Sequence, residues 1–522
     1  MREHVRSGVD PPLRMAPPDP LDLSPLDPDD PDDAPPGKPA AGKPAGNAPR
    51  SFLFDDPVPA GPKATPAASK PAPAPARSAA PARGAAVAAS PAPRPGAPFS
   101  LRLRGGWSTF AWRCAAVYAV LFCLPFPCSV VSWTTPLADA VEDAERAAVP
   151  WLAQRIGLAI DVPAKTNGSG DTSYNWFWLA SVVTLALLLG AAWHLLRWNR
   201  RPGPRARDAL RTYVRYFLGA MMLSYGVAKV IPLQFGVLDA DTLSSRWGDA
   251  SPMGVLWTFH ALSPAYTMFT GLIETVAGML LFWRGTALLG ALFTAAAMAQ
   301  VAMLNFCYDV PVKILSTHLL AFAVLLCVRD APRLFDLFVR NRPVAAAELW
   351  PWAEARWLRL SARVVQLAFV AWLAFAQVRE ALDWWQKRNA PQPPYTGTWQ
   401  VDAFARDGAE IAPFTSPTRW TQVGFAQGGC GVTATDGSRQ GFRVEVDAAR
   451  SAMKLSGIAG PERQAPPPFE LKFKMPDDAH LELDGEQDGA TLRVRCRRLQ
   501  TTDFFLGQRG FHWINEFPLN RR

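Results

Sequence analysis

The chain has 522 residues, a formal net charge of +9 and a mean hydropathy near zero, so it is long enough for several domains. Its Lys and Arg residues cluster in loops beside long apolar runs. This pattern is typical of membrane topology and argues against a nucleic-acid partner. No P-loop and no Gly-x-Gly-x-x-Gly sequence occurs, which disfavours nucleotide chemistry.

Residues 1–104 form a Pro/Ala-rich segment, and half of the 50 prolines of the chain lie in residues 1–100. Such a composition cannot bury enough apolar surface to offset the entropy lost on ordering, so we expect a disordered tail. The first apolar run starts only after Arg104, so we do not expect a cleavable signal peptide.

Apolar runs that approach the ~20 residues needed to cross a bilayer predict an α-helical membrane bundle of about seven transmembrane helices. Two of these helices fall in residues 105–200, four in 209–340 and one in 360–388. The runs are 107–133, 175–198, 213–233, 265–283, 286–306, 314–328 and 364–385. Residues 134–173 read as a polar extracytoplasmic loop. The shorter apolar segment 253–259 reads as an interfacial or re-entrant helix.

The distribution of basic residues predicts the orientation. The loops 197–215 and 329–363 each contain seven arginines, whereas 134–173 contains only Arg146, Arg155 and Lys165. Basic loops stay in the cytoplasm. We therefore expect a bacterial inner-membrane protein with a cytoplasmic N-terminus and a periplasmic or extracellular C-terminal domain.

That C-terminal domain, 390–522, changes to a period of two and contains Asp-Gly turn signals, which predicts a small all-β antiparallel barrel or sandwich. The expected strands are 397–401, 419–425, 441–446, 469–473, 480–483 and 491–496. The triplet Gly397-x-Trp399 is reminiscent of calycin barrels. Cys430 and Cys496 could form a disulfide in an oxidising compartment, but the spacing alone leaves open whether they do.

Polar and ionisable side chains interrupt the four central spans, and such groups within a membrane are functional candidates. The candidate pocket consists of Tyr225, Lys229, Glu274, Asn305, Tyr308, Asp309, Lys313 and His318. Side chains lean toward the N-terminus of their own helix, so Lys229 and Glu274, on helices of opposite direction, are biased toward each other. Glycines 219, 226, 271 and 278 would let these two helices approach closely.

Several interpretations of this cluster remain open. It could be a buried network that fixes helix register, or a pocket for a small polar or quinone-like molecule with Lys229, Glu274 and His318 as proton-handling groups. A metal site of His318 with Asp309, Glu274, His260 or His512 has no close His/Cys spacing to support it, and no evident His pair supports haem, so neither is expected. A transporter would fit the charges, but inverted repeats are not visible.

The run Arg215-Tyr-Phe-Leu-Gly-Ala-Met-Met-Leu-Ser-Tyr-Gly-Val-Ala-Lys229, the Glu274 helix, Leu304-Asn-Phe-Cys-Tyr-Asp-Val-Pro-Val-Lys313 and Ser316-Thr-His318 together resemble the DoxX-like four-helix membrane proteins. The ending Arg509-Gly-Phe-His-Trp-Ile-Asn-Glu-Phe-Pro518 resembles the close of their longer bacterial members. The resemblance covers about 210–340 and, loosely, the C-terminal domain.

This resemblance implies redox work, since relatives are subunits of a thiosulfate:quinone oxidoreductase, but it does not supply a reaction. We therefore expect a redox-associated membrane protein that binds a quinone or small polar substrate, with the bilayer and a membrane or periplasmic redox protein as partners. The alternative is a non-enzymatic scaffold whose β domain binds another envelope protein.

Overall fold

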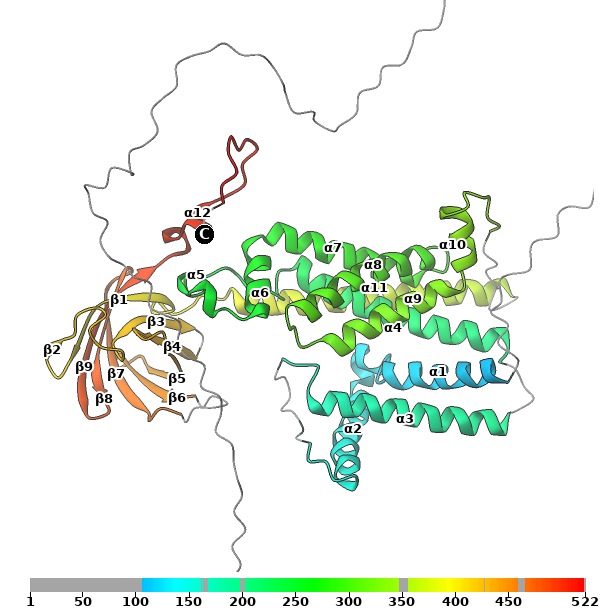
Figure 1. Cartoon of the computed structure of the whole chain (residues 1–522), viewed down its shortest axis with the longest axis horizontal. Helices are drawn as coiled ribbons and strands as arrows, with labels where there is room; N and C mark the ends of the chain where they lie inside the picture. Colours follow the sequence, from blue (N-terminus) through cyan, green and yellow to red (C-terminus); the bar gives the residue numbers. More distant parts are fainter. Residues whose placement is uncertain are drawn as a thin grey trace, which may run out of the picture. The chain divides into compact units, whose positions relative to one another are not determined.

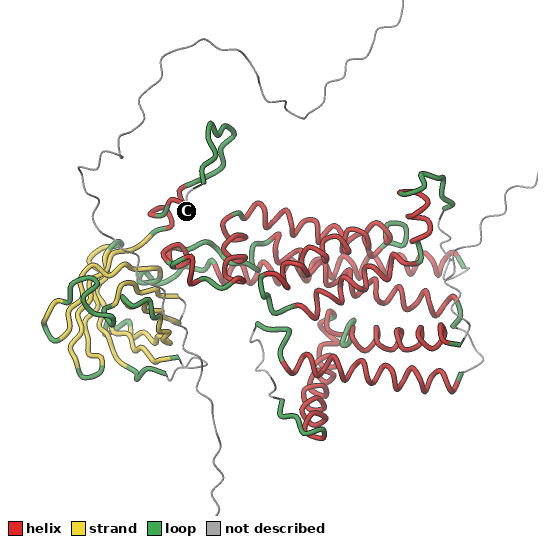
Figure 2. Tube along the Cα trace, in the orientation of Figure 1, coloured by secondary structure: helices red, strands yellow, loops and turns green. Residues whose placement is uncertain are grey.

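A computed structural model describes residues 106–160, 162, 168–197, 202–346, 355–426, 428–458 and 465–520. The predicted disordered tail, 1–104, lies outside the described residues. All elements below belong to one compact unit, Pro93–Arg522. Figures 1 and 2 show helices in its first part and strands in its last part.

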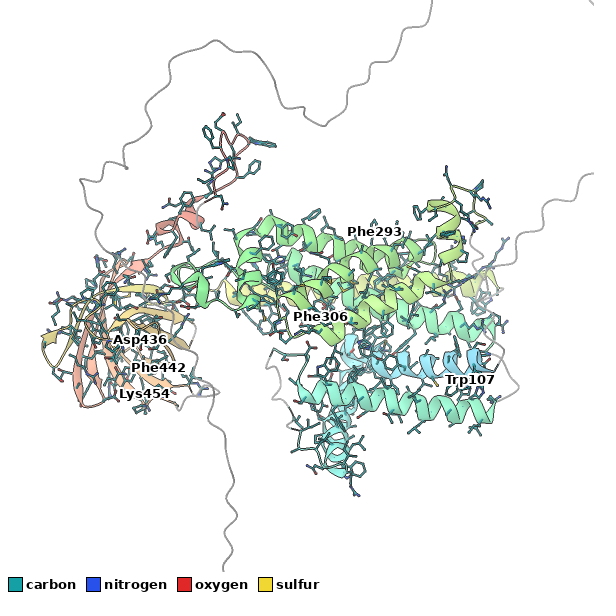
Figure 3. All side chains as sticks on the ribbon, viewed as in Figure 1. Trp107, Phe293, Phe306, Asp436, Phe442 and Lys454 are labelled. Atoms are coloured by element: carbon teal, nitrogen blue, oxygen red, sulfur yellow. The ribbon has the colours of Figure 1, made fainter. Side chains whose placement is uncertain are left out.

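Among the described residues, five helical segments are long and apolar enough to cross a membrane, as expected of a membrane protein. They are Trp107–Val130, which contains α1 (Trp107–Cys123), α3 (Ser173–Leu196), α7 (Pro264–Phe282), α8 (Ala287–Cys307) and α11 (Arg356–Arg388). The pair α9 (Lys313–Val328) and α10 (Ala331–Phe338), bent by 77°, is a sixth candidate. Figure 3 labels Phe293 and Phe306 of α8, which are exposed as expected of lipid-facing side chains.

Helix α4 (Pro204–Val230) has 11 buried residues, yet it is not one of the candidate spans. Its first half carries several arginines, and Lys229 lies in its last turn. Leu218 and Met222 of α4 are fully buried. The predicted count of seven spans depends on α4 and α9 and stays a prediction.

The expected polar loop 134–173 contains a helix that we did not predict, α2 (Thr135–Arg155). Its acidic residues suggested a loop, but they alternate with alanines, which have the highest helix propensity, and Pro136 lies at the helix start, where proline is tolerated. The short helices α5 (Ala240–Ser244) and α6 (Pro252–Leu262) follow α4, and α6 includes the predicted segment 253–259.

The C-terminal domain is a closed antiparallel barrel of eight strands. The sequence predicted either a barrel or a sandwich, and the structure shows the barrel. Its strands are β1 (Gly397–Arg406), β3 (Trp420–Ala426), β4 (Gly429–Ala434), β5 (Arg439–Asp447), β6 (Ala452–Gly457), β7 (Phe469–Asp477), β8 (His480–Gln487) and β9 (Ala490–Leu499). Neighbours in sequence pair in turn, and β1 closes the barrel by pairing with β9 along Thr398–Leu499 to Arg406–Leu492. The two-residue strand β2 (Ala409–Glu410) pairs with β1 at one end.

Strands β4 and β6 were absent from the sequence prediction. Glycines 429 and 431 interrupt the apolar alternation of β4, and glycine is depleted in strands, so its period of two was hidden. Both strands lie between predicted ones, so the up-and-down order was unaffected.

Large side chains fill the barrel interior, which suits the width of an eight-stranded barrel. Trp399, Met453, Leu471 and Phe442 are all at most 1% exposed. Figure 3 labels Phe442. The Arg498 guanidinium lies 4.3 Å from the ring centroid of Trp399, and the Trp399 indole N–H donates to the Tyr395 carbonyl at 2.8 Å. The triplet Gly397-x-Trp399 thus anchors the first strand of the barrel.

The last described segment is exposed, and it neither closes the barrel as a strand nor plugs it. Phe511, Trp513 and Phe517 are 78%, 91% and 83% exposed. Pairing of β1 with β9 closes the barrel instead.

All seven cysteines lie among the described residues and are free thiols, so the disulfide between Cys430 and Cys496 is not formed in this structure. Both thiols are buried inside the barrel, and burial raises the pKa of each from 9.0 to about 12. The thiols are therefore kept protonated and unreactive at neutral pH.

The raised thiol pKa values predict how barrel stability depends on pH. Their contribution is fully present below about 9, where thiols of the unfolded chain stay protonated, and is lost as the pH rises toward about 12. Melting temperatures between pH 8 and pH 11 should fall more in the wild type than in a Cys430→Ala/Cys496→Ala variant. An equal fall in both proteins would contradict the assignment.

Candidate functional site

Four glycines bring α4 and α7 into backbone contact. A Cβ built on Gly226 would lie 2.6 Å from the Thr275 nitrogen, and one on Gly271 would lie 2.7 Å from the Gly226 carbonyl oxygen. Gly219 and Gly278 face each other in the same way, with the Gly219 carbonyl oxygen 2.9 Å from a Cβ on Gly278. The predicted close approach is confirmed, and any larger residue at Gly226 or Gly271 would push the helices apart.

The same helix pair carries a buried ion pair between Lys229 and Glu274. Their side chains are 7% and 3% exposed, and the Lys229 ammonium donates to Glu274 Oε1. The predicted convergence of these two charges is confirmed. Tyr225 lies one turn before Lys229 on α4 and interacts electrostatically with Glu274.

The second carboxylate oxygen of Glu274 is different. Oε2 is buried, and no side chain or backbone group of the described residues donates a hydrogen bond to it. A buried carboxylate oxygen without a donor is costly, so this atom is the strongest chemical sign of a ligand group in the bundle.

His260 of α6, which the sequence analysis considered only as a metal ligand, interacts with Lys229 of this pair. The Thr267 hydroxyl donates its one hydrogen to the His260 carbonyl at 2.9 Å. His260 Nδ1 lies 3.1 Å from the Thr267 hydroxyl oxygen, so Nδ1 must be the donor in that hydrogen bond. Burial and, secondly, the charge of Lys229 lower the pKa of His260 to about 4. The ring is therefore neutral at pH 7 and stacks on Phe235 with centroids 4.0 Å apart.

Asn305, Asp309 and Lys313 form a separate group at the turn between α8 and α9. Asn305 Nδ2 donates to the Ser316 hydroxyl at 3.0 Å, and Lys313 Nζ lies 2.8 Å from the Asp309 carboxylate. Tyr308 ends α8, where its N–H donates to the Leu304 carbonyl. These contacts secure the turn and do not include Lys229 or Glu274.

Asp171, before α3, completes this group and was missed by the sequence analysis. Its two carboxylate oxygens accept from the backbone N–H groups of Lys313 and Ile314 at 2.7 and 2.9 Å. These are the otherwise unpaired N–H groups at the start of α9, where a carboxylate is favoured. Asp171 lies 142 residues from Lys313 in the chain, so no local pattern announced this contact.

Removal of this cap gives a direct test. An Asp171→Ala substitution should lower the free energy of unfolding by about 1–2 kcal/mol, the usual effect of losing a helix cap. Asp309→Asn is the matched control because the Asp309 carboxylate is 83% exposed and Asn tolerates the backbone φ of 50° at this position, so it should cost less than about 1 kcal/mol. Denaturant unfolding in detergent measures both, and equal losses would contradict the capping role.

His318 contacts α1 rather than Lys229 or Glu274 among the described residues, which corrects the expected grouping of the three residues. Its Nδ1–H donates to the Ile314 carbonyl at 2.6 Å, so Nε2 accepts the hydrogen bond of the Tyr118 hydroxyl. The ring stacks on Phe122, with centroids 4.1 Å apart. Tyr118 and Phe122 both belong to α1, so His318 joins α9 to α1.

The structure also shows whether side chains that could bind a metal ion lie together. In the part of the chain that the structure describes, no three His, Cys, Asp or Glu side chains gather where they could hold a metal ion. The contacts described above divide the candidate residues into three groups. Of these, only the group around Lys229 and Glu274 combines buried charges with a buried oxygen that lacks a hydrogen-bond donor.

Comparisons with known proteins give one informative relative. No family model matches the chain, and no solved structure matches it significantly. The uncharacterized protein YwoB of Bacillus subtilis (strain 168) is 30% identical over 151 residues, which are 28% of this chain and 96% of that protein. The chain therefore belongs to the same family as YwoB.

Proposed function

We propose that the α4–α7 pair binds a quinone or a similar small polar redox substrate at Lys229 and Glu274. The observation that carries this proposal is Glu274 Oε2, which is buried and has no donor among the described residues. An ionised carboxylate only accepts hydrogen bonds, so the ligand group that meets Oε2 is a donor, such as the hydroxyl of a quinol. The ammonium of Lys229 has three hydrogens and uses one for Glu274, so it can also donate to a ligand oxygen.

This site belongs, in our proposal, to a DoxX-like protein of the bacterial inner membrane. The arginine-rich loops 197–215 and 329–363 support a cytoplasmic N-terminus, seven spans and a β-barrel outside the cytoplasm. Lys229 and Glu274 then lie in the outer half of the bundle, and the partner protein is a membrane or periplasmic redox protein.

The proposal is tested by the quinone content and the optical spectrum of the protein purified in detergent. Wild type should retain quinone, and Glu274→Gln should lose it. Asp208→Asn is the matched control, because Asp208 pairs with Arg284 at the other end of the same helix pair but is 39% exposed. Retention of equal quinone by Glu274→Gln, or none in wild type, would overturn the proposal.

A non-enzymatic scaffold is the second candidate. It is favoured by the direct pairing of Lys229 with Glu274, which needs no ligand to compensate either charge, and by the filled barrel, which leaves only the barrel surface for recognition. Under this reading a chain without 390–522 loses its envelope partner, whereas Glu274→Gln alters only stability. Partner binding that survives the deletion would exclude the scaffold.

A further inference from the structure

We propose that α2 is an amphipathic helix that lies in the lipid headgroup region, with its exposed apolar side in contact with acyl chains. The inference does not depend on the proposed ligand at Glu274. It assigns a lipid surface as the partner of a helix that the bundle covers on one side only.

The position of α2 suits a helix on the membrane surface. It contacts Cys128–Val130, at the end of the first span, and the start of α3, so it lies at one end of both spans. Figure 1 shows α2 running across α1 and α3 rather than alongside them. With 21 residues it is about 31 Å long, yet it is not among the candidate spans.

One side of α2 packs on the bundle. Ala138, Val149 and Ala153 are buried, and the Glu145 side chain bonds to Trp178 in the second turn of α3. This contact fixes the rotation of α2 about its axis, and hence the direction of its two exposed sides.

The first exposed side is apolar. At 3.6 residues per turn, Leu137, Ala144, Ala148 and Trp151 fall within a sector about 60° wide. Leu137 and Trp151 are 59% and 57% exposed. A shallow hollow on this side is lined by Ala140, Val141, Ala144, Glu145 and Ala148.

The second exposed side is acidic and points in roughly the opposite direction. Asp139 and Asp143 are both exposed, whereas Glu142 falls in the sector of the buried Ala138, Val149 and Ala153. Beside membrane spans, a helix with separate apolar and charged sides is suited to lie in the membrane interface, with the apolar side buried in the acyl boundary.

Lipid fits the apolar side better than a protein does, for two reasons. Its neighbour α3, a candidate span, exposes apolar side chains as lipid-facing helices do, with Leu187 and Leu188 50% and 63% exposed. Arg155 stacks on Trp151 with 4.9 Å between its guanidinium carbon and the ring centroid, and Trp with a nearby Arg is typical of residues at headgroup level. The acidic side gives no attraction to anionic lipids, so apolar contact supplies the binding.

The test measures which side of α2 faces lipid. A fluorescent amino acid is placed at position 144 or, as the matched control, at position 139, in the full chain reconstituted as single copies in nanodiscs. Both native residues are exposed, so both variants should fold, which their melting temperatures verify. Brominated phosphatidylcholine should quench the probe at 144 at least about twofold more than the probe at 139, and aqueous iodide should do the reverse.

Two results would overturn the assignment. Equal quenching by brominated lipid at both positions would show that α2 has no lipid-facing side. Protection of position 144 from both quenchers would show that protein, rather than lipid, covers it.

Discussion

Replacing Glu274 by leucine alone should lower the free energy of unfolding by about 3–5 kcal/mol, the usual cost of breaking a buried ion pair. The loss arises because the Lys229 ammonium is left buried, only 7% exposed, without its counter-charge. Unfolding in mixed micelles, followed by circular dichroism, measures this change. A loss below about 1 kcal/mol, as for an exposed pair, would contradict it.

The double variant Lys229→Met/Glu274→Leu tests whether the two charges stabilise each other. Two apolar side chains of similar volume remove both charges, so most of the stability should return. The matched control is Asp208→Leu, which breaks the half-exposed pair with Arg284 and should cost about 1 kcal/mol or less. Losses in the double variant that equal the sum of the single losses would show that the two charges do not stabilise each other.

Replacing Gly271 by alanine should cost about 1–3 kcal/mol, the range for an overpacked contact. The new Cβ would lie 2.6 Å from the Lys229 Cβ, 2.7 Å from the Gly226 carbonyl oxygen and 2.8 Å from the Val230 nitrogen. Two of these three atoms belong to the backbone of α4, so a side-chain rotation cannot relieve the contact. The helices must separate, which also weakens the Lys229–Glu274 pair.

Gly285→Ala is the matched control for this substitution. A Cβ at Gly285 meets no atom within 4 Å, so the melting temperature should stay that of the wild type. Equal melting temperatures for Gly271→Ala and Gly285→Ala would show that α4 and α7 do not need their close contact.

Features set by local pattern were predictable. Apolar run length predicted α7 and α8 to within about two residues at each end, and a period of two predicted most of the strands. The meeting of Lys229 with Glu274 followed from the lean of helical side chains and from the glycines beside them.

Features that depend on distant contacts were not predictable. Tyr118 and His318 are 200 residues apart, and nothing in the sequence near His318 indicates that it turns toward α1. Asp171 was one acidic residue among several in a supposed loop, and its role depends on where the start of α9 lies. His260 was considered only as a metal ligand, and its interaction with Lys229 was missed because α6 is too short to span the membrane.

The most direct measurement of the central claim is the equilibrium binding of a short-chain quinol to the purified protein, compared with the Lys229→Met/Glu274→Leu double variant and with Asp208→Asn. Loss of a hydrogen bond to a charged group is worth about 1.5–3 kcal/mol, so the Kd should rise about 10- to 100-fold in the double variant. It should be unchanged in Asp208→Asn. Equal affinity of the wild type and a folded double variant, or the absence of saturable binding, would contradict the claim that Glu274 holds a ligand.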